Sequence, residues 1–544
     1  MKKSRKAISL ILIVILAMSL LASCAKTGNE GSTPPTTSSN PPSSPSPSAS
    51  APVKGDVIKP VEGVKYAKEM DVIVDNNKIP ALSPFLPSSG FSSSCWVFTM
   101  IYDRLVAKLD DGTYGPELAT SWDTTDYQTY TFKLRNDVTF HNGDKFTAQD
   151  VVDTMAIALA APGSGAYDRW SGVETATVID EYTLEIKLKN VDVNFLFSIS
   201  VPFMGIVNKK AIDADSEKGT WIGTGAWRAT DFLTNDYVTM VRNDDYWGQK
   251  TITEKISLRF VPEPSTRLMR LQNGESDVCF SLDPVDQPLI EADTENFVAY
   301  KFIYNICNMM AFNMADPITG DLNFRKAVAS AIDRVEIGLA CLGEYAQAET
   351  QGTFYGLETE FRNNDIPIIP YDIDKAKEYL ADSPYNGETI EITAAISTNI
   401  IVAEILQQQL SKIGINIKVN GVDPANLMSA TAYGNNTTQI VIFVGAFTSS
   451  AASFRNQYYP GTGTNRTSYN NPELTELLDK APTVIDENER RDLYYKMQEM
   501  VAEDPPSFNL FWMENMASCV KGVGGIITST DAYMDLTYIY RVID

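Results

Sequence analysis

The sequence predicts a mixed α/β fold, because segments with the two-residue periodicity of strands alternate with segments of helical periodicity. Three observations support this prediction: hairpin patterns at residues 129–140 and 176–189, a β-α-β pattern at residues 388–422, and two helix starts marked by capping residues. The chain shows no internal repeat. We therefore expect sheets covered by helices.

The two hairpin patterns consist of apolar side chains that alternate with polar ones on both sides of a turn. In residues 129–140 the turn chemistry lies at 136–137, and in residues 176–189 it lies at 180–181. Alternation of this kind places one face of each strand against a core. We expect two half-buried β-hairpins.

The two helix starts follow residues that cap helices well. Thr147 stands three residues before Asp150, ahead of apolar positions at helical spacing, which is the pattern of a capping box. Near the end of the chain, Asn471 occupies an N-cap position and Pro472 the first helical position. Helices should begin at both places.

The β-α-β pattern is the strongest sign of a parallel sheet. Residues 388–396 have the pattern of a strand, residues 399–414 that of a helix ended by Gly414, and residues 415–422 that of a second strand. Parallel strands need a crossover connection, which is usually a helix. We expect these two strands to lie in one sheet.

The N-terminus has the features of a secretory signal. Four cations at residues 2–6 precede an apolar stretch, residues 7–21, that is too short for a comfortable membrane span. The sequence Leu-Ala-Ser-Cys that ends at Cys24 resembles the bacterial lipobox. We therefore expect residues 1–23 to be a lipoprotein signal peptide and Cys24 to carry a diacylglyceryl anchor, whose two acyl chains suffice for stable attachment. The alternative is an uncleaved signal anchor.

Residues 24–52 are rich in Ser, Thr and Pro and cannot bury enough apolar surface to fold. We expect a disordered stalk that holds the rest of the protein away from the membrane. About 490 residues follow, and 44% of the whole chain is apolar, so two or three globular domains are expected. The expected location is the extracytoplasmic face of the cell membrane.

The composition excludes several classes of function. The net charge is −24, and about −28 without residues 1–23, so nucleic acid is not an expected partner. The other five cysteines are widely spaced with no CxxC pair, which favours scattered thiols over a disulfide framework. The only histidine, His141, excludes HExxH and multi-histidine metal sites. No metal or cofactor is expected.

Enzyme motifs are also missing from the sequence. It has no GxSxG elbow, no Walker loop, and no GxGxxG motif after a strand. A lipoprotein hydrolase would need a nucleophile with a base, and only His141 could serve as an imidazole base. We therefore expect a protein that is not an enzyme, with the hydrolase and a purely adhesive surface protein as the alternatives.

Seven motifs then identify a family by their order along the chain. They lie at 115–155, 223–232, 241–248, 267–278, 323–337, 371–380 and 490–511. Together they resemble the family 5 extracellular solute-binding proteins of ABC importers, the peptide and nickel receptor family, over nearly all of residues 66–544. The resemblance implies capture of a small solute and its delivery to a permease whose ATPase is a separate polypeptide.

The same resemblance implies a two-lobed, periplasmic-binding-protein-like fold with a small accessory domain and a cleft that closes by a hinge. We expect the chain to leave the first lobe and return to it. The expected segments are 53–105, 221–308 and 508–544 for the first lobe, 106–220 for the accessory domain, and 309–507 for the second lobe.

The ligand is the least determined part of this interpretation. In peptide-binding relatives, a loop after a strand carries an aspartate that pairs with the ligand's α-ammonium. The comparable stretch here, residues 441–459, contains no acid, and Phe447 or Thr448 falls at that position. We therefore expect binding that is indifferent to the amine, unless a carboxylate from another loop substitutes.

Peptide is the first expected ligand, oligosaccharide the second and nickel the third. Aromatic, hydroxyl and amide groups suit sugar faces, whereas histidine is scarce and no soft-ligand cluster is visible. The candidate ligand-binding residues are Ser94, Trp96, Phe447, Thr448, Ser449 and Arg455.

Overall fold

The computed structural model describes residues 60–75, 79, 81–86, 92–109, 112–280, 282–352, 355–528 and 534–543. The predicted signal peptide, the predicted lipid-attachment residue Cys24 and the predicted stalk lie outside these residues. In the described part of the chain, no helix has the length and apolar character needed to cross a bilayer.

The largest sheet of the described residues has eleven strands, ten of them in the order β16-β15-β17-β13-β18-β12-β2-β11-β10-β9, with β14 paired to β18. Their bounds are β2 Glu69–Asp75, β9 Trp227–Leu233, β10 Tyr237–Arg242, β11 Lys255–Phe260, β12 Val278–Cys279, β13 Phe297–Phe312, β14 Ala346–Ala348, β15 Thr389–Ala394, β16 Asn416–Gly421, β17 Ile440–Ala446 and β18 Ser507–Val520.

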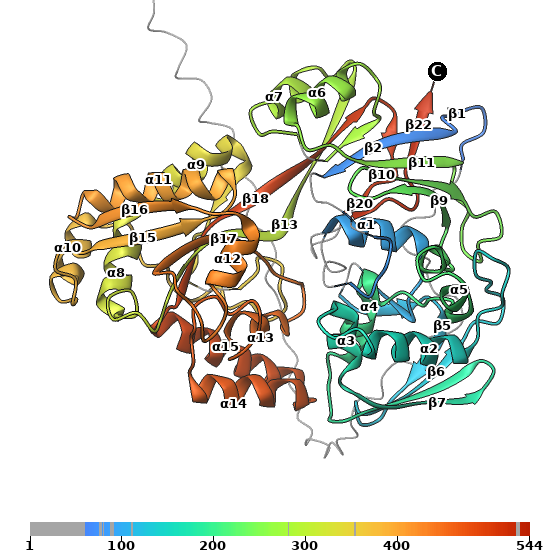
Figure 1. Ribbon diagram of the computed structural model, residues 1–544, viewed down its shortest axis with the longest axis horizontal. Coiled ribbons are helices and arrows are strands. Elements are labelled where there is room, and N and C mark those ends of the chain that lie inside the picture. The colour runs from blue at the N-terminus through green and yellow to red at the C-terminus, as the bar shows by residue number, and fades with distance from the viewer. Residues whose placement is uncertain are drawn as a thin grey trace, which may run out of the picture. The chain divides into compact units, whose positions relative to one another are not determined.

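Two long antiparallel strands connect the halves of this sheet. Figure 1 shows β13 and β18 running between β15–β17 on one side and β2 with β9–β11 on the other. Their pairing extends from Phe297 opposite Val520 to Ala311 opposite Ser507, and its register shifts between Ile303 and Cys307. The ladder is therefore interrupted near the point where the chain passes from one half to the other.

The predicted β-α-β unit is confirmed. Strands β15 and β16 are parallel, and helix α11, Ser397–Ser411, connects them. Gly414 follows the helix with a positive φ of 88°, a conformation that glycine adopts without steric cost. The half of the sheet that contains β15–β17 is also surrounded by α8 Leu322–Ala331, α9 Arg334–Leu342, α10 Ile373–Ala381, α12 Pro424–Ala430, α13 Ser453–Tyr458, α14 Pro472–Lys480 and α15 Glu487–Glu503 (Figure 1).

A separate four-stranded sheet has the order β5-β6-β8-β7. Its strands are β5 Ala119–Asp123, β6 Thr129–Leu134, β7 Val173–Asp180 and β8 Thr183–Leu188. The hairpin predicted at 176–189 is confirmed as β7 and β8. Helix α2, Ala148–Leu159, begins after Thr147, whose N–H donates to the Asp150 carboxylate at 2.8 Å. The predicted capping box is confirmed.

The hairpin predicted at residues 129–140 is wrong. Strand β6 ends at Leu134 and pairs with β5 and β8. Beyond it, Thr139 forms only an isolated bridge with Lys145. Val138 and Phe140 are buried, but neither belongs to a β-strand. Their apolar character therefore reflects core packing, and the turn before them takes the chain out of the sheet.

The remaining elements flank these sheets. The other helices that precede β13 in the chain are α1 Ser92–Ile101, α3 Gly165–Trp170, α4 Phe195–Ser200, α5 Lys209–Ala214, α6 Pro264–Gln272 and α7 Gln287–Ala292. Short 3-10 helices are η1 Pro202–Met204, η2 Lys218–Trp221, η3 Gly343–Tyr345 and η4 Ala481–Thr483. Small strands are β1 Lys65–Tyr66, β3 Val106–Lys108, β4 Tyr114–Pro116, β19 Val523–Gly524, β20 Ile527–Thr528, β21 Met534–Asp535 and β22 Tyr540–Ile543.

Among the described residues, buried apolar side chains form three large clusters. The accessory core region draws on residues 105–206, and the C-terminal core region on residues 310–511. The N-terminal core region combines residues 70–102, 207–290 and 516–539, which are far apart in the sequence. The chain therefore leaves this last region and returns to it twice.

Candidate functional site

A cavity of about 240 Å³ lies between residues of the accessory core region and residues of the C-terminal core region. The first supplies Arg169 and Asp192, and the second supplies Thr448, Ser453 and Arg455. Ligand sites occur preferentially between domains and combine a concave surface with a few placed polar groups. This cavity has both properties.

Direct contacts join the two regions near the cavity. The Val193 N–H donates to the Pro482 carbonyl at 3.0 Å, one residue after Asp192. The ammonium group of Lys108, at the end of β3, donates to the Ser449 hydroxyl, one residue after Thr448. The cavity is therefore held between two polar contacts that cross from one region to the other.

Asp192 is the acidic side chain of the cavity wall. Its carboxylate is partly buried and accepts a hydrogen bond from the Asn194 N–H at 2.9 Å. Burial raises the pKa of the Asp192 carboxyl, and the Asn194 N–H and the guanidinium groups of Arg169 and Arg455 act in the opposite direction. A desolvated carboxylate thus lies within electrostatic range of two cations.

Both guanidinium groups of the wall are oriented by aromatic rings. Arg455 lies over the Tyr459 ring at 3.5 Å, and its Nη1 is 2.8 Å from the Asp479 carboxylate. Arg169 lies over the Phe197 ring at 5.5 Å. Cation–π contacts of this kind favour one orientation of a long side chain.

Residues 355–362 hold the loop that follows β17 by hydrogen bonds to its backbone. The Thr359 hydroxyl donates to the Thr448 carbonyl at 2.7 Å, and the Glu360 N–H donates to the Ser449 carbonyl at 2.8 Å. These bonds use the backbone of the loop. These bonds hold Thr448 in place at the cavity that it lines.

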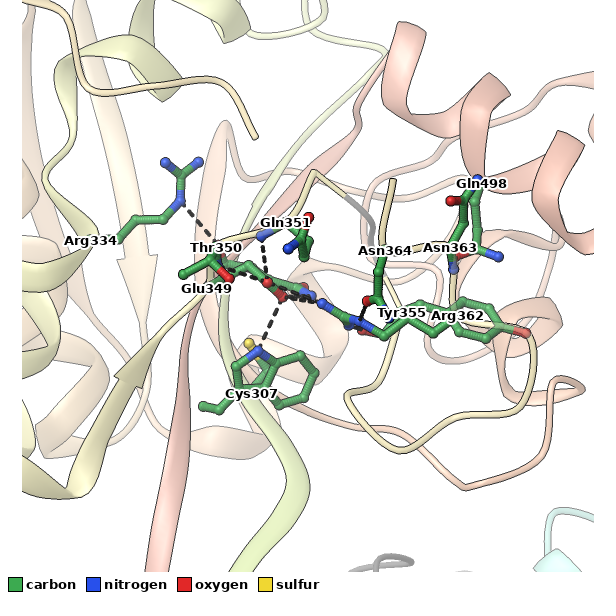
Figure 2. Close-up of polar contacts among 12 residues, drawn as sticks. Cys307, Arg334, Glu349, Thr350, Gln351, Tyr355, Arg362, Asn363, Asn364 and Gln498 are labelled. Carbon is green, nitrogen blue, oxygen red and sulfur yellow. Dashed lines mark hydrogen bonds and ion pairs between the residues drawn. The ribbon is translucent and has the colours of Figure 1, made fainter. Parts of the chain in front are cut away.

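A buried ion pair anchors this supporting segment. Figure 2 shows Glu349 facing Arg362, and their side chains are only 3% and 5% exposed. Glu349 accepts from Arg362 Nη2 at 3.1 and 3.2 Å, from the N–H groups of Thr350 and Gln351 at 2.9 and 2.8 Å, and from Trp512 Nε1 at 3.1 Å. Both oxygens are satisfied, as a buried carboxylate requires.

The same arginine holds the segment itself in shape. Arg362 donates through Nη1 to the Tyr355 carbonyl and through Nε to Asn364 Oδ1, the latter at 2.9 Å (Figure 2). Since Trp512 belongs to β18, the pair ties the segment to a central strand of the sheet. Glu349 and Arg362 thus support the segment that in turn holds the cavity loop.

The structure brings two of the predicted ligand residues, Thr448 and Arg455, to the cavity. Ser449 lies beside it and contacts Lys108. Phe447 is only 1% exposed, and its ring centroid lies 5.8 Å from that of Trp512 in a small apolar cluster. Its side chain therefore packs in a core.

Ser94 and Trp96 are placed elsewhere, on α1. Both are buried in the N-terminal core region, with exposures of 2% and 4%. The Trp96 ring packs edge-on against Phe280, with centroids 4.8 Å apart. The structure does not bring these two residues to the cavity.

Sequence reasoning missed Arg169 and Asp192. They lie in a part of the chain more than 250 residues before Thr448, and no local motif marks them as functional. The available signal was weak: Asp192 and Asn194 follow the last strand of the small sheet, at the strand end where loop residues often meet a partner.

Histidine and cysteine are common reactive side chains, and both occur among the described residues. Among them, no group of three or more His, Cys, Asp or Glu side chains is arranged to hold a metal ion. Within the described residues, no disulfide bond joins the cysteines, which are Cys95, Cys279, Cys307, Cys341 and Cys519. Burial lowers the pKa of His141 to about 4, and both of its ring nitrogens contact backbone groups of Gly223 and Gly225.

Known proteins resemble this chain in sequence over much of its length. The family described as "Bacterial extracellular solute-binding proteins, family 5 Middle" matches residues 113–466. The dipeptide-binding protein DppE of Bacillus subtilis (strain 168) is 25% identical over 519 residues, which cover 87% of this chain and 92% of DppE. The nickel-binding periplasmic protein of Escherichia coli (strain K12) is 26% identical over 378 residues, which cover 64% of this chain and 70% of that protein.

Solved structures agree on the fold. The ABC transporter substrate-binding protein CtaP of Listeria monocytogenes superposes with a TM-score of 0.78 at 23% identity, covering 88% of this chain and 100% of CtaP. DppA of Helicobacter pylori in complex with the peptide STSA gives a TM-score of 0.76 at 24% identity, covering 88% of this chain and 98% of DppA. This chain belongs to the bacterial extracellular solute-binding proteins of family 5 and has their two-lobed fold.

Proposed function

We propose that this protein is the substrate-binding component of an ABC importer, which captures a peptide outside the cell and delivers it to a permease with a separate ATPase. The observation that carries this proposal is the cavity between the two core regions, with charged side chains on both walls. Relatives named for dipeptide and oligopeptide binding support the choice of ligand. Burial of a solute by such a site needs no covalent chemistry.

We propose a hinge for the capture step. The irregular pairing of β13 and β18 between Ile303 and Cys307 lies where the chain passes between the halves of the sheet. Lobes that pivot about such a point close around a ligand. In this proposal the first lobe comprises residues 53–105, 221–308 and 508–544, with 106–220 as accessory domain and 309–507 as second lobe.

Peptide is preferred to oligosaccharide because of the side chains that line the cavity. Sugar faces stack on exposed aromatic rings, but Phe447 and Trp96 are buried in cores. The cavity wall instead carries two guanidinium groups and a carboxylate. Nickel is disfavoured by the single histidine of the chain.

The proposed function predicts that peptides stabilise the purified protein against heat. A ligand present at 100 times its dissociation constant adds about 2.7 kcal/mol to the free energy of unfolding, which raises the melting temperature. Mixed-sequence libraries of dipeptides and hexapeptides would be compared with a mixture of oligosaccharides by differential scanning fluorimetry. A rise with sugars alone, or with neither class, would contradict the proposal.

We also propose that Cys24 carries the lipid anchor that keeps the receptor at the membrane. Only a thiol can form the diacylglyceryl thioether, so Cys24→Ser is expected to move the protein from the detergent phase to the aqueous phase of a Triton X-114 partition. Cys341→Ser is the matched control and should stay in the detergent phase. Unchanged partitioning of the Cys24 variant would remove the assignment.

A further inference from the structure

We propose that the accessory core region selects the ligand: Asp192 binds the ammonium group of a short zwitterionic peptide, while Arg169 and Arg455 bind its carboxylate. This inference rests on the proposed function and deepens it. It assigns ligand specificity to two residues, Arg169 and Asp192, that lie outside the predicted lobes.

The first support is the coordination of Asp192. Within the described residues, its carboxylate accepts hydrogen bonds only from Asn194, from the N–H to Oδ1 at 2.9 Å and from the side-chain amide, and no Lys or Arg nitrogen lies within 4.0 Å. A partly buried carboxylate is costly to desolvate unless a cation or several donors compensate it. A ligand ammonium placed against Oδ2 would supply that compensation.

The second support is the opposite wall. The hydroxyl of Ser453, a residue that is 6% exposed, has no hydrogen-bond partner within the described residues. Beside it, Arg455 uses Nη1 for the Leu478 carbonyl at 3.0 Å and for Asp479. Its Nε and Nη2 make no hydrogen bond with any described residue. Buried polar groups nearly always have partners, so the Ser453 hydroxyl is open to a bound anion, and the partly exposed Arg455 guanidinium adds donors beside it.

The third support is the mixture of charges in one small space. An anionic ligand would face Asp192, and a cationic ligand would face two guanidinium groups. A ligand that carries both charges satisfies both sets, and the electrostatic match gives specificity. At about 240 Å³, the cavity is smaller than the roughly 300–1,000 Å³ typical of sites for drug-sized ligands. The structure thus favours a short peptide whose two ends are close together.

This arrangement also places an amine anchor where the sequence lacked one. Residues 441–459 contain no acid, yet Asp192 lines the same cavity as Thr448 from the other wall. The expected indifference to the amine is therefore replaced by sensitivity to it. Because Asp192 and Arg455 belong to different core regions, a zwitterion bound to both would hold the two regions together.

The test uses a mixed-sequence dipeptide library in four forms: unmodified, N-acetylated, C-amidated and blocked at both ends. Dissociation constants would be measured by isothermal titration calorimetry for the wild type and for Asp192→Asn and Arg169→Gln. A charge-assisted hydrogen bond is worth about 10- to 100-fold in affinity. The affinity of the wild type for the library should fall by that factor when the peptides are N-acetylated, and by a similar factor when they are C-amidated.

The two variants test separately the contacts made by the amino end and by the carboxyl end of the peptide. Asp192→Asn should bind the unmodified library about 10- to 100-fold more weakly and discriminate less than about threefold against acetylation. Arg169→Gln should keep the discrimination against acetylation and lose most of that against amidation. Asp168→Asn, an exposed neighbour that does not line the cavity, is the matched control and should behave like the wild type.

Two kinds of failure are distinguishable. If dipeptides or hexapeptides bind but acetylation has no effect on the wild type, or Asp192→Asn keeps full discrimination, this inference is wrong and the proposed function stands. If no peptide library of either length binds in any form, the proposed function fails with it. Melting temperatures of the variants without ligand would show that each one folds.

Discussion

Replacing Glu349 with glutamine is expected to lower the free energy of unfolding by about 3–5 kcal/mol, because it removes one partner of a buried ion pair. The substitution keeps the shape of the side chain but leaves the Arg362 guanidinium, in a side chain only 5% exposed, without its carboxylate (Figure 2). The Trp512 indole N–H would also lose a charged acceptor. The midpoint of urea unfolding measures the loss.

Glu378→Gln is the matched control for this prediction. Glu378 pairs with Lys375 at 2.6 Å on the surface of α10, with side chains 66% and 49% exposed. Exposed pairs contribute about 0–1 kcal/mol, so this variant should unfold almost like the wild type. Equal losses in the two variants would show that the buried pair is not a special source of stability.

A double substitution would separate the charge from the space it fills. Glu349→Gln combined with Arg362→Met removes both charges, and replacing a whole buried pair costs less than breaking it. We expect the double variant to be more stable than Glu349→Gln alone. Peptide affinity should still fall in the double variant, since Arg362 also holds the segment that supports Thr448.

His141 is expected to give the protein a second large effect, the loss of about 3 kcal/mol of stability as the pH falls from about 6.5 to about 4. In the folded chain, Nδ1 accepts from the Gly223 N–H at 3.3 Å and Nε2 contacts the Gly225 carbonyl at 3.0 Å. If Nδ1 were protonated, its N–H would face the Gly223 N–H, and this hydrogen bond would be lost. Burial keeps the ring neutral and lowers its pKa to about 4, with a smaller contribution from Arg228, while the hydrogen bonds to the backbone of Gly225 and Trp221 act in the opposite direction.

The sign follows from proton binding in the two states. The unfolded chain binds a proton at His141 below its ordinary pKa of about 6.5, whereas the folded chain binds one only below about 4. The stabilisation is therefore complete above pH 6.5 and decreases as the pH falls through this window. Protons bound by the unfolded chain drive the loss.

Urea unfolding of the wild type and His141→Gln at several pH values between 7.5 and 4 measures this effect. Glutamine does not titrate. The free energy of unfolding of the wild type minus that of the variant should therefore decline by about 3 kcal/mol as the pH falls across the window. Other titrating groups cancel in this difference, and the chain has no second histidine. A difference that stays constant with pH would refute the assignment.

Local signals in the sequence were enough to predict several elements of the fold. Thr147 with Asp150 and Asn471 with Pro472 start α2 and α14, because their capping contacts lie within one helical turn. The β-α-β unit was recognisable from periodicity and from Gly414. The hairpin at 129–140 failed because the partners of β6 are chosen by tertiary packing, which alternation along one segment does not report.

The candidate site was predictable only in part, and for a related reason. Thr448 and Arg455 were found through the resemblance to a family. Arg169 and Asp192 were missed because packing of distant segments, not a local pattern, brings them to the same cavity. Phe447 and Trp96 are predicted as aromatic ligand contacts but lie in cores, because an aromatic side chain in the sequence does not show whether its ring is exposed or buried.

Hydrogen–deuterium exchange tests most directly whether a solute is captured between the accessory core region and the loop after β17. The full protein would be compared with and without the mixed-sequence dipeptide library at a saturating concentration. The proposed site predicts slower amide exchange on both walls of the cavity, in residues 192–198 and in residues 448–456. Tight binding with protection on neither wall, or on only one, would contradict it.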